Sequence, residues 1–263
     1  MKPSAIKRIA VLVSIGRHPV SGVPRYSRND AAALGLASEL AQSSAAVGID
    51  VIHAGHAGNP ALSEYLALGA VKVSVIETAI AQDVLPALLE QLQGYDLVLC
   101  GSRAESGEAS GMLPYQLAAR LKLPLLADVI AVTAGSDAVV AQQFLPKGRR
   151  REVALQLPAL LTVHPLAPSR LRYAYARLRA GRIISQPFPA AVPVPDTGDM
   201  WQTEAVKALP RKLAAPEKRS GHARMQAATV AESRGGKVVQ EGSAADKART
   251  LLAYLREHHL VDY

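Results

Sequence analysis

Apolar runs of strand length alternate with segments of helical spacing through the first half of the chain. Such alternation is typical of parallel strands joined by helical crossovers, because a parallel pair needs a long connection. The sequence therefore predicts an α/β fold with a doubly wound, mainly parallel sheet. The expected strands are 8–15, 50–54, 71–76 and 95–100, and the expected helices are 29–47, 61–68, 80–92 and 112–121.

The segment 95–111 changes character abruptly at Gly101, where a buried apolar run gives way to glycines and serines. Gly101, Gly107 and Gly111 let the backbone approach a ligand closely, and the helix start that follows favours an anion such as phosphate. Ligands of doubly wound sheets bind beyond the carboxyl ends of the strands, so loops 14–17, 54–58 and 101–111 are expected to form one crevice. The loop matches neither common phosphate-binding glycine pattern, and an ordinary strand-to-helix connection explains it equally well.

The pattern changes after Leu123. Short strands are expected at 128–133, 138–145, 152–156 and 160–163, and they form an antiparallel extension because no crossover helix lies between them. Residues 186–242 have no sustained periodicity and are interpreted as an extended arm, which ends in an amphipathic helix at 244–258. The predicted division is an α/β domain at 1–185 and an arm with its helix at 186–263.

Composition restricts the class of protein. The chain has 263 residues, 49% of them hydrophobic, which is enough for a large core. A single cysteine, Cys100, excludes an internal disulfide framework. No apolar run approaches the roughly 20 residues of a membrane-spanning helix, and the first residues lack a signal sequence. We expect a cytoplasmic protein without membrane insertion.

Positive charge is concentrated between Lys147 and Arg182, which span nine basic residues and one acid, whereas the whole chain has a formal net charge of +8. Nucleic acid is one partner for such a segment. The segment contains no recognised nucleic-acid-binding motif, however, and few aromatic residues. An acidic protein surface is therefore the favoured partner, with no nucleic acid expected.

Four short segments, in the correct order, resemble the beta subunit of an electron transfer flavoprotein. The family's Asp-Leu-Val-Leu-x-Gly-Lys/Arg-Gln-Ala resembles Asp96-Leu-Val-Leu-Cys-Gly-Ser-Arg-Ala104, and its Leu-Pro-Ala-Val-Val-Thr resembles Leu157-Pro-Ala-Leu-Leu-Thr162. Its Leu-Ala-Met-Gly-Ala resembles Leu66-Ala-Leu-Gly-Ala70. The segment Ser27-Arg-Asn-Asp-Ala-Ala-Ala-Leu-Gly-Leu-Ala37 stands where the family has Asn-Pro-Phe-Asp/Cys-Glu leading into the first helix. The resemblance covers most of residues 6–185 and identifies the chain as a divergent member.

The resemblance implies an adenine-nucleotide-binding fold that pairs with an alpha subunit, which carries the electron-transferring FAD. It implies an electron carrier without catalytic residues of its own, with AMP or a second FAD in the crevice and a flavin-dependent dehydrogenase as partner. The cofactor-binding residues carried over by position are Ser14, Asn29, Asp30, Gly101, Ser102, Arg103, Gly107, Ser110 and Gly111. The partner-docking residues are Leu166, or Leu171 as its alternative, with Arg170 and Arg172.

Three alternative interpretations fit the sequence less well. A stand-alone nucleotide-binding protein of the universal-stress type shares the early strand and helix pattern, but it lacks both the basic segment and the long arm. A hydrolase requires a placed nucleophile, and Ser106 and Ser110 have no GxSxG context. His53 and His56 have no third ligand in the sequence pattern, so no metal site is expected.

Overall fold

The computed structural model describes residues 6–43, 47–79, 82–106, 109–135, 138–188, 220–222, 225, 239–258 and 260–261. The chain divides into two compact units, Met1–Asp196 and Thr197–Tyr263. The first unit contains the sheet and its helices, and the second contains helix α7 (Ala244–Glu257). The Cys100 thiol is free and buried, and burial raises its pKa, so it packs as a small apolar group.

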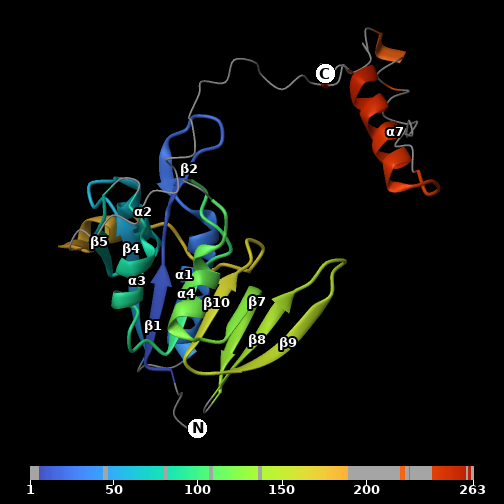
Figure 1. Ribbon diagram of the computed structural model, residues 1–263. Coiled ribbons are helices and arrows are strands. Elements are labelled where there is room, and N and C mark those ends of the chain that lie inside the picture. The colour runs from blue at the N-terminus through green and yellow to red at the C-terminus, as the bar shows by residue number, and fades with distance from the viewer. Residues whose placement is uncertain are drawn as a thin grey trace. The chain divides into compact units, whose positions relative to one another are not determined.

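A nine-stranded sheet forms the centre of the first unit (Figure 1). Its order is β11-β5-β4-β1-β6-β10-β7-β8-β9, and every pair from β11 to β7 is parallel, whereas the pairs β7–β8 and β8–β9 are antiparallel. The parallel strands are β11 (Arg182–Pro187), β5 (Lys72–Glu77), β4 (Gly48–Gly55), β1 (Arg8–Leu12), β6 (Leu97–Gly101), β10 (Ala159–Val163) and β7 (Leu125–Ala134). The extension is formed by β8 (Ala138–Phe144) and β9 (Arg150–Gln156).

Helices cover both faces of the parallel strands. Alternate residues of β1 point to opposite faces, so Ile9 and Val11 join one core cluster, whereas Ala10 and Leu12 join the other. The first cluster is completed by α1 (Arg28–Ser43) and α2 (Ala61–Leu68), and the second by α3 (Leu85–Gln91) and α4 (Leu113–Leu121). The predicted doubly wound α/β fold with an antiparallel extension is therefore confirmed.

One predicted strand occupies a different place from the one expected. Residues 160–163 were assigned to the antiparallel extension, but β10 lies between β6 and β7 and is parallel to both. All five of its residues are buried, as a central parallel strand requires. Only Leu157 and Pro158 separate β9 from β10, and so short a link suggested an antiparallel neighbour.

Three small elements were not predicted. A hairpin of β2 (Ile15–Arg17) and β3 (Pro24–Tyr26) forms a separate antiparallel pair between β1 and α1. The short helix α5 (Tyr175–Ala180) precedes β11, which pairs with β5 at the edge of the sheet. Strand β11 ends at Pro187, two residues beyond the predicted domain boundary.

The predicted arm lies largely outside the described residues, but its terminal helix is described. Helix α7 begins with a capping box, in which Ser243 Oγ accepts from the Asp246 N–H and the Asp246 carboxylate accepts from the Ser243 N–H. None of its residues is buried, and the Leu251 side chain is 60% exposed. Within the described part of the chain, no helix has the length and apolarity needed to cross a membrane.

Candidate functional site

The carboxyl ends of β1, β4 and β6 meet beside the first turn of α1, as a doubly wound sheet requires. Ser14 follows β1, Gly55 ends β4, and Gly101 ends β6. The predicted crevice loops are thus brought to one edge of the sheet. Their contacts define which groups remain available to a ligand.

Asp30 fastens two of these loops together. Its Oδ2 accepts hydrogen bonds from the Ser14 N–H at 2.8 Å and from the Ser14 hydroxyl, while its Oδ1 accepts from the Gly101 N–H at 3.0 Å. The residue is only 4% exposed, and burial raises the pKa of its carboxyl to about 6 although these hydrogen bonds oppose the shift. Both carboxylate oxygens are therefore committed to the protein's own backbone and hydroxyl groups.

Tyr65 connects the same loops from α2. Its hydroxyl donates to the Ser14 carbonyl oxygen at 2.7 Å and accepts from the Ser27 N–H at 2.9 Å. Ser27 in turn caps α1, since its hydroxyl accepts from the Asp30 N–H at 3.3 Å. The loops after β1 and before α1 are consequently held by one buried network.

His53 lies at the end of β4 and contacts the first loop. Its Nδ1 is 2.8 Å from the Val13 carbonyl oxygen, so the Nδ1–H donates to that oxygen. Burial lowers the pKa of the imidazole, which favours the neutral ring. Within the described residues, no group of three or more His, Cys, Asp or Glu side chains is arranged to hold a metal ion.

The glycines of the loop after β6 are required for different structural reasons. A Cβ on Gly101 would lie 2.5 Å from Asp30 Oδ1 and 2.6 Å from Asn29 Cβ, so this glycine permits close approach of the loop to α1. Gly111 has a φ of 72°, a conformation that favours glycine. The predicted ligand Gly107 lies outside the described residues.

The remaining predicted cofactor residues also lie around this loop. Asn29 Nδ2 donates to the Arg103 carbonyl oxygen at 3.0 Å, which ties α1 to the loop, while the Arg103 side chain is exposed. The Ser110 hydroxyl accepts from the Met112 N–H at 3.3 Å, just before α4. Ser102 is partly exposed. The structure therefore brings the described members of the predicted set together at one edge of the sheet, where Asp30 and Asn29 hold the loops to one another.

Glu105 and Arg25 belong to this site but were not predicted. Glu105 Oε1 accepts from the Arg28 N–H at 2.9 Å, and Glu105 Oε2 lies 2.7 Å from Arg25 Nη2. On the other side of the hairpin, Glu64 accepts from the Tyr26 N–H at 2.7 Å. The one signal in the sequence was an acidic residue inside a glycine- and serine-rich loop. Carboxylates from two other segments thus accept backbone N–H groups at the end of β3 and at the start of α1.

The predicted docking residue Leu166 stands at a turn after β10. The Ala167 N–H donates to the His164 carbonyl oxygen at 2.9 Å, and the Leu166 N–H donates to His164 Nδ1 at 3.1 Å. Ala167 is buried, whereas Leu166 is 71% exposed. Because these hydrogen bonds and Pro165 restrict the backbone of the turn, Leu166 is displayed to solvent from a restrained backbone.

A stack of side chains supports this turn from the extension. The His164 ring lies 4.0 Å from the Phe144 ring with an interplanar angle of 10°, and the Arg150 guanidinium lies 4.4 Å from the centre of the Phe144 ring. The His164 N–H also donates to the Val129 carbonyl oxygen at 2.9 Å. The antiparallel strands therefore help to fix the position of the Leu166 turn.

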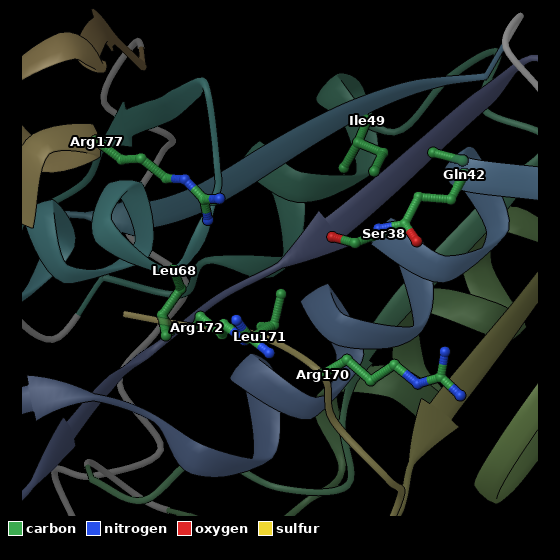
Figure 2. Close-up of a pocket in the computed structure, with 10 residues that line it drawn as sticks. Ser38, Gln42, Ile49, Leu68, Arg170, Leu171, Arg172 and Arg177 are labelled. Carbon is green, nitrogen blue, oxygen red and sulfur yellow. The ribbon is translucent and has the colours of Figure 1, made fainter. Parts of the chain in front are cut away.

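The other predicted docking residues line a pocket of about 480 Å³ near the amino end of β4 (Figure 2). Its apolar wall includes Leu171, which packs against the core and close to Gly35 of α1. Its basic residues are Arg170, Arg172 and Arg177. Arg170 lies 3.8 Å from Glu39. The structure thus separates the two leucine candidates, since Leu166 is exposed and Leu171 is partly buried.

Comparison with known proteins places these features in one class. The model of the electron transfer flavoprotein domain matches residues 24–181. The electron transfer flavoprotein subunit beta of Chromohalobacter salexigens is 37% identical over 260 residues, which cover 96% of this chain and 95% of that protein. The chain therefore belongs to the electron transfer flavoprotein family. It is a beta-subunit member, so its role is electron transfer, and membership implies association with a flavin and an alpha-subunit partner.

A solved structure, the C-terminal domain of the coenzyme A biosynthesis bifunctional protein CoaBC, is less similar to this chain than the Chromohalobacter subunit is. It is 18% identical and covers 59% of this chain and 90% of its own, with a TM-score of 0.27. A likeness at this level supports no conclusion about function.

Proposed function

We propose that this chain forms a heterodimer with an alpha subunit that holds the electron-transferring FAD, and that the pair takes electrons from a flavin-dependent dehydrogenase. The observation that carries the proposal is 37% identity to a beta subunit over 96% of the chain. FAD, when bound, supplies the electron-accepting chemistry. The beta chain contributes binding and docking and has no catalytic residues of its own.

The crevice at the carboxyl edge of the sheet is proposed to bind an adenine nucleotide, either AMP or a second FAD. The residues around it suit a phosphate, because Gly111 turns the backbone, Ser102 and Ser110 carry hydroxyls, and Arg103 carries an exposed positive charge. Ser14, Asn29, Asp30 and Gly101 are proposed to shape the adenine and ribose side. Asp30 acts there through the loops it holds, since its carboxylate already accepts three hydrogen bonds.

The Leu166 turn is proposed to dock the dehydrogenase. An apolar side chain on a turn that is already fixed loses little conformational entropy when it enters a partner's pocket. Arg170 and Arg172 follow on the same segment and would attract an acidic partner surface. Leu171 is assigned to packing rather than docking, because it lies against the core.

Helix α7 is proposed to pack on the alpha subunit. Its apolar stripe includes Leu251 and Leu255, and no residue of the helix is buried in the described chain. An amphipathic helix with a capped start and an exposed stripe suits a helix-to-protein contact. Because the capping box stabilises the first turn, the helix can already be formed before it contacts a partner.

The experiment that tests the proposal is co-expression of this chain with its alpha-subunit partner, followed by mass spectrometry of the nucleotides released on denaturation. The proposal expects a one-to-one complex that releases FAD together with AMP, or FAD in excess of one per complex. A complex that releases FAD at one per heterodimer and no other nucleotide contradicts the proposed nucleotide site. A chain that forms no complex contradicts the heterodimer.

A further inference from the structure

Glu105 places a carboxylate among the loops of the proposed nucleotide site, at a point where an anionic ligand group would also be attracted. Its Oε1 accepts from the Arg28 N–H at the start of α1, and its Oε2 lies 2.7 Å from Arg25 Nη2. The two charged side chains are only 18% and 19% exposed, respectively. A phosphate oxygen binds the same two kinds of group, a backbone N–H and a guanidinium.

The ion pair between Glu105 and Arg25 is poorly satisfied. Within the described residues, Arg25 Nε and Glu105 Oε2 are buried side-chain atoms that have no hydrogen bond of acceptable geometry, although the two charged groups are in contact. Buried charges that lack full hydrogen bonding keep much of their desolvation cost. An anion that bound Arg25 with better geometry would therefore compete effectively with Glu105.

The Glu105 carboxylate lies close to the hairpin of β2 and β3 in this arrangement. A Cβ on Gly16 would lie 2.6 Å from Glu105 Oε2, so the absence of a side chain at Gly16 makes room for the carboxylate. The next residue, Ser106, donates from its hydroxyl to the Ile15 carbonyl oxygen. The hairpin and the loop after β6 are thus closed on each other at this point.

We propose that Glu105 determines how strongly the crevice binds anionic nucleotides, because its carboxylate competes with the ligand's phosphate for Arg25 and the Arg28 N–H. This inference rests on the proposed nucleotide site and adds the residue that sets its preference for charge. A nucleotide phosphate displaces Glu105 from Arg25, whereas an uncharged nucleoside leaves the pair in place. A carboxylate that is only a brace would instead affect both ligands equally.

The test compares AMP with adenosine on the heterodimer after its bound nucleotide has been removed. Glu105→Gln keeps the size of the side chain and an acceptor for the Arg28 N–H, but it removes the negative charge. We expect AMP to bind about tenfold more tightly to this variant, as removal of one nearby like charge allows, with adenosine affinity unchanged. Arg25→Ala should weaken AMP binding in both the wild-type and the Glu105→Gln backgrounds.

Glu64→Gln is the matched control. Glu64 also accepts a backbone N–H next to α1, from Tyr26 at 2.7 Å, and its replacement changes the net charge by the same amount. AMP affinity should respond to Glu105→Gln and not to Glu64→Gln. Equal changes for AMP and adenosine, or weaker AMP binding to Glu105→Gln, would overturn the proposal.

A measurement on the unmodified heterodimer covers the case in which the variant does not fold. Carboxyl footprinting by mass spectrometry should label Glu105 faster with AMP bound than with adenosine bound, because AMP displaces the carboxylate into solvent. Slower labelling of Glu105 with AMP would refute the displacement. If neither AMP nor adenosine binds to any form of the heterodimer, the proposed nucleotide site is wrong. If both bind with affinities that do not depend on Glu105, only the proposed role of Glu105 is wrong.

Discussion

Replacement of Asp30 by Asn tests whether a buried carboxylate controls the pH dependence of this fold. The pKa of Asp30 is raised from 3.8 to about 6, chiefly by burial. A carboxyl with a raised pKa in the folded state holds its proton more tightly there than in the unfolded chain. The stability linked to this proton is therefore fully present below about pH 4 and is lost as pH rises through about 6.

The size of the effect follows from the shift. At about 1.4 kcal/mol per pKa unit, the full difference is about 3 kcal/mol between strongly acidic and neutral solution. Integration of the two titrations gives a loss of about 2 kcal/mol between pH 4 and 7, of which about 1 kcal/mol falls between pH 5 and 7. Asp30→Asn should remove this component, because the amide does not titrate.

The assay is chemical denaturation of the heterodimer, wild type and Asp30→Asn, at half-unit intervals from pH 5 to 7. The difference between the two free energies of unfolding isolates Asp30 from the other titrating groups. The amide can replace only part of the hydrogen bonding, since it faces N–H groups of Ser14 and Gly101 with one acceptor oxygen. Because the wild type gains stability from the Asp30 proton as pH falls and the amide does not, the free energy of unfolding of the variant should fall relative to that of the wild type from pH 7 to 5. A difference that stays constant from pH 5 to 7 would refute the raised pKa.

The remaining predictions concern the crevice and the docking turn. Gly101→Ala should destabilise the heterodimer by about 1–3 kcal/mol in thermal denaturation because its methyl group would meet Asp30. Gly48→Ala should have little effect, since its Cβ would meet only the Lys7 carbonyl oxygen at 3.7 Å; similar losses for both would remove the packing argument. Tyr65→Phe should cost about 1–3 kcal/mol by leaving two buried backbone groups unpaired, and an unchanged melting temperature would contradict that role. Leu166→Ala should slow stopped-flow flavin reduction by the dehydrogenase at unchanged melting temperature, whereas Leu171→Ala should lower the melting temperature; the reverse result would exchange their roles.

The parallel part of the fold could be predicted because its signals are local. Strand β1 has four buried apolar residues in succession, and α1 repeats leucines at helical spacing beside it. A strand buried on both faces and followed by an amphipathic helix permits few arrangements other than a crossover unit. The first four predicted strands consequently appear as neighbours, in the order β5-β4-β1-β6.

The missed elements depend on contacts that are distant in sequence or weak in pattern. Strand β11 is exposed at all six residues, so it carries no apolar alternation, and its pairing with β5 supplies its structure. Helix α5 has only six residues and buries none of them. Strand β10 has a clear apolar pattern, but its insertion between β6 and β7 is a property of the whole sheet.

For the candidate site, the sequence predicted where the residues lie but not what their side chains contact. The sequence correctly predicted that Ser14, Asp30 and Gly101 lie together, because the topology of the sheet brings their loops to one edge. It predicted Asp30 as a cofactor-binding residue, but it did not indicate that the carboxylate oxygens accept hydrogen bonds from groups 16 and 71 residues away. Whether a carboxylate serves a ligand or the chain depends on which donors the fold places beside it, and a local motif does not contain that information.

Three carboxylates around the start of α1 bear on what the crevice can hold. Glu105 accepts the Arg28 N–H at this start, and Glu64 accepts the Tyr26 N–H at the end of the preceding strand. Asp30 lies in the first turn, and its oxygens accept hydrogen bonds from the neighbouring loops. Negative charge at a helix start is favourable for the helix, but it also takes the positions that a phosphate uses at such an end. For the phosphate of the proposed nucleotide to reach Arg25 and the Arg28 N–H, it would therefore have to displace Glu105. Family membership establishes the fold and the electron-transfer role, while these side chains would determine how strongly the proposed nucleotide binds.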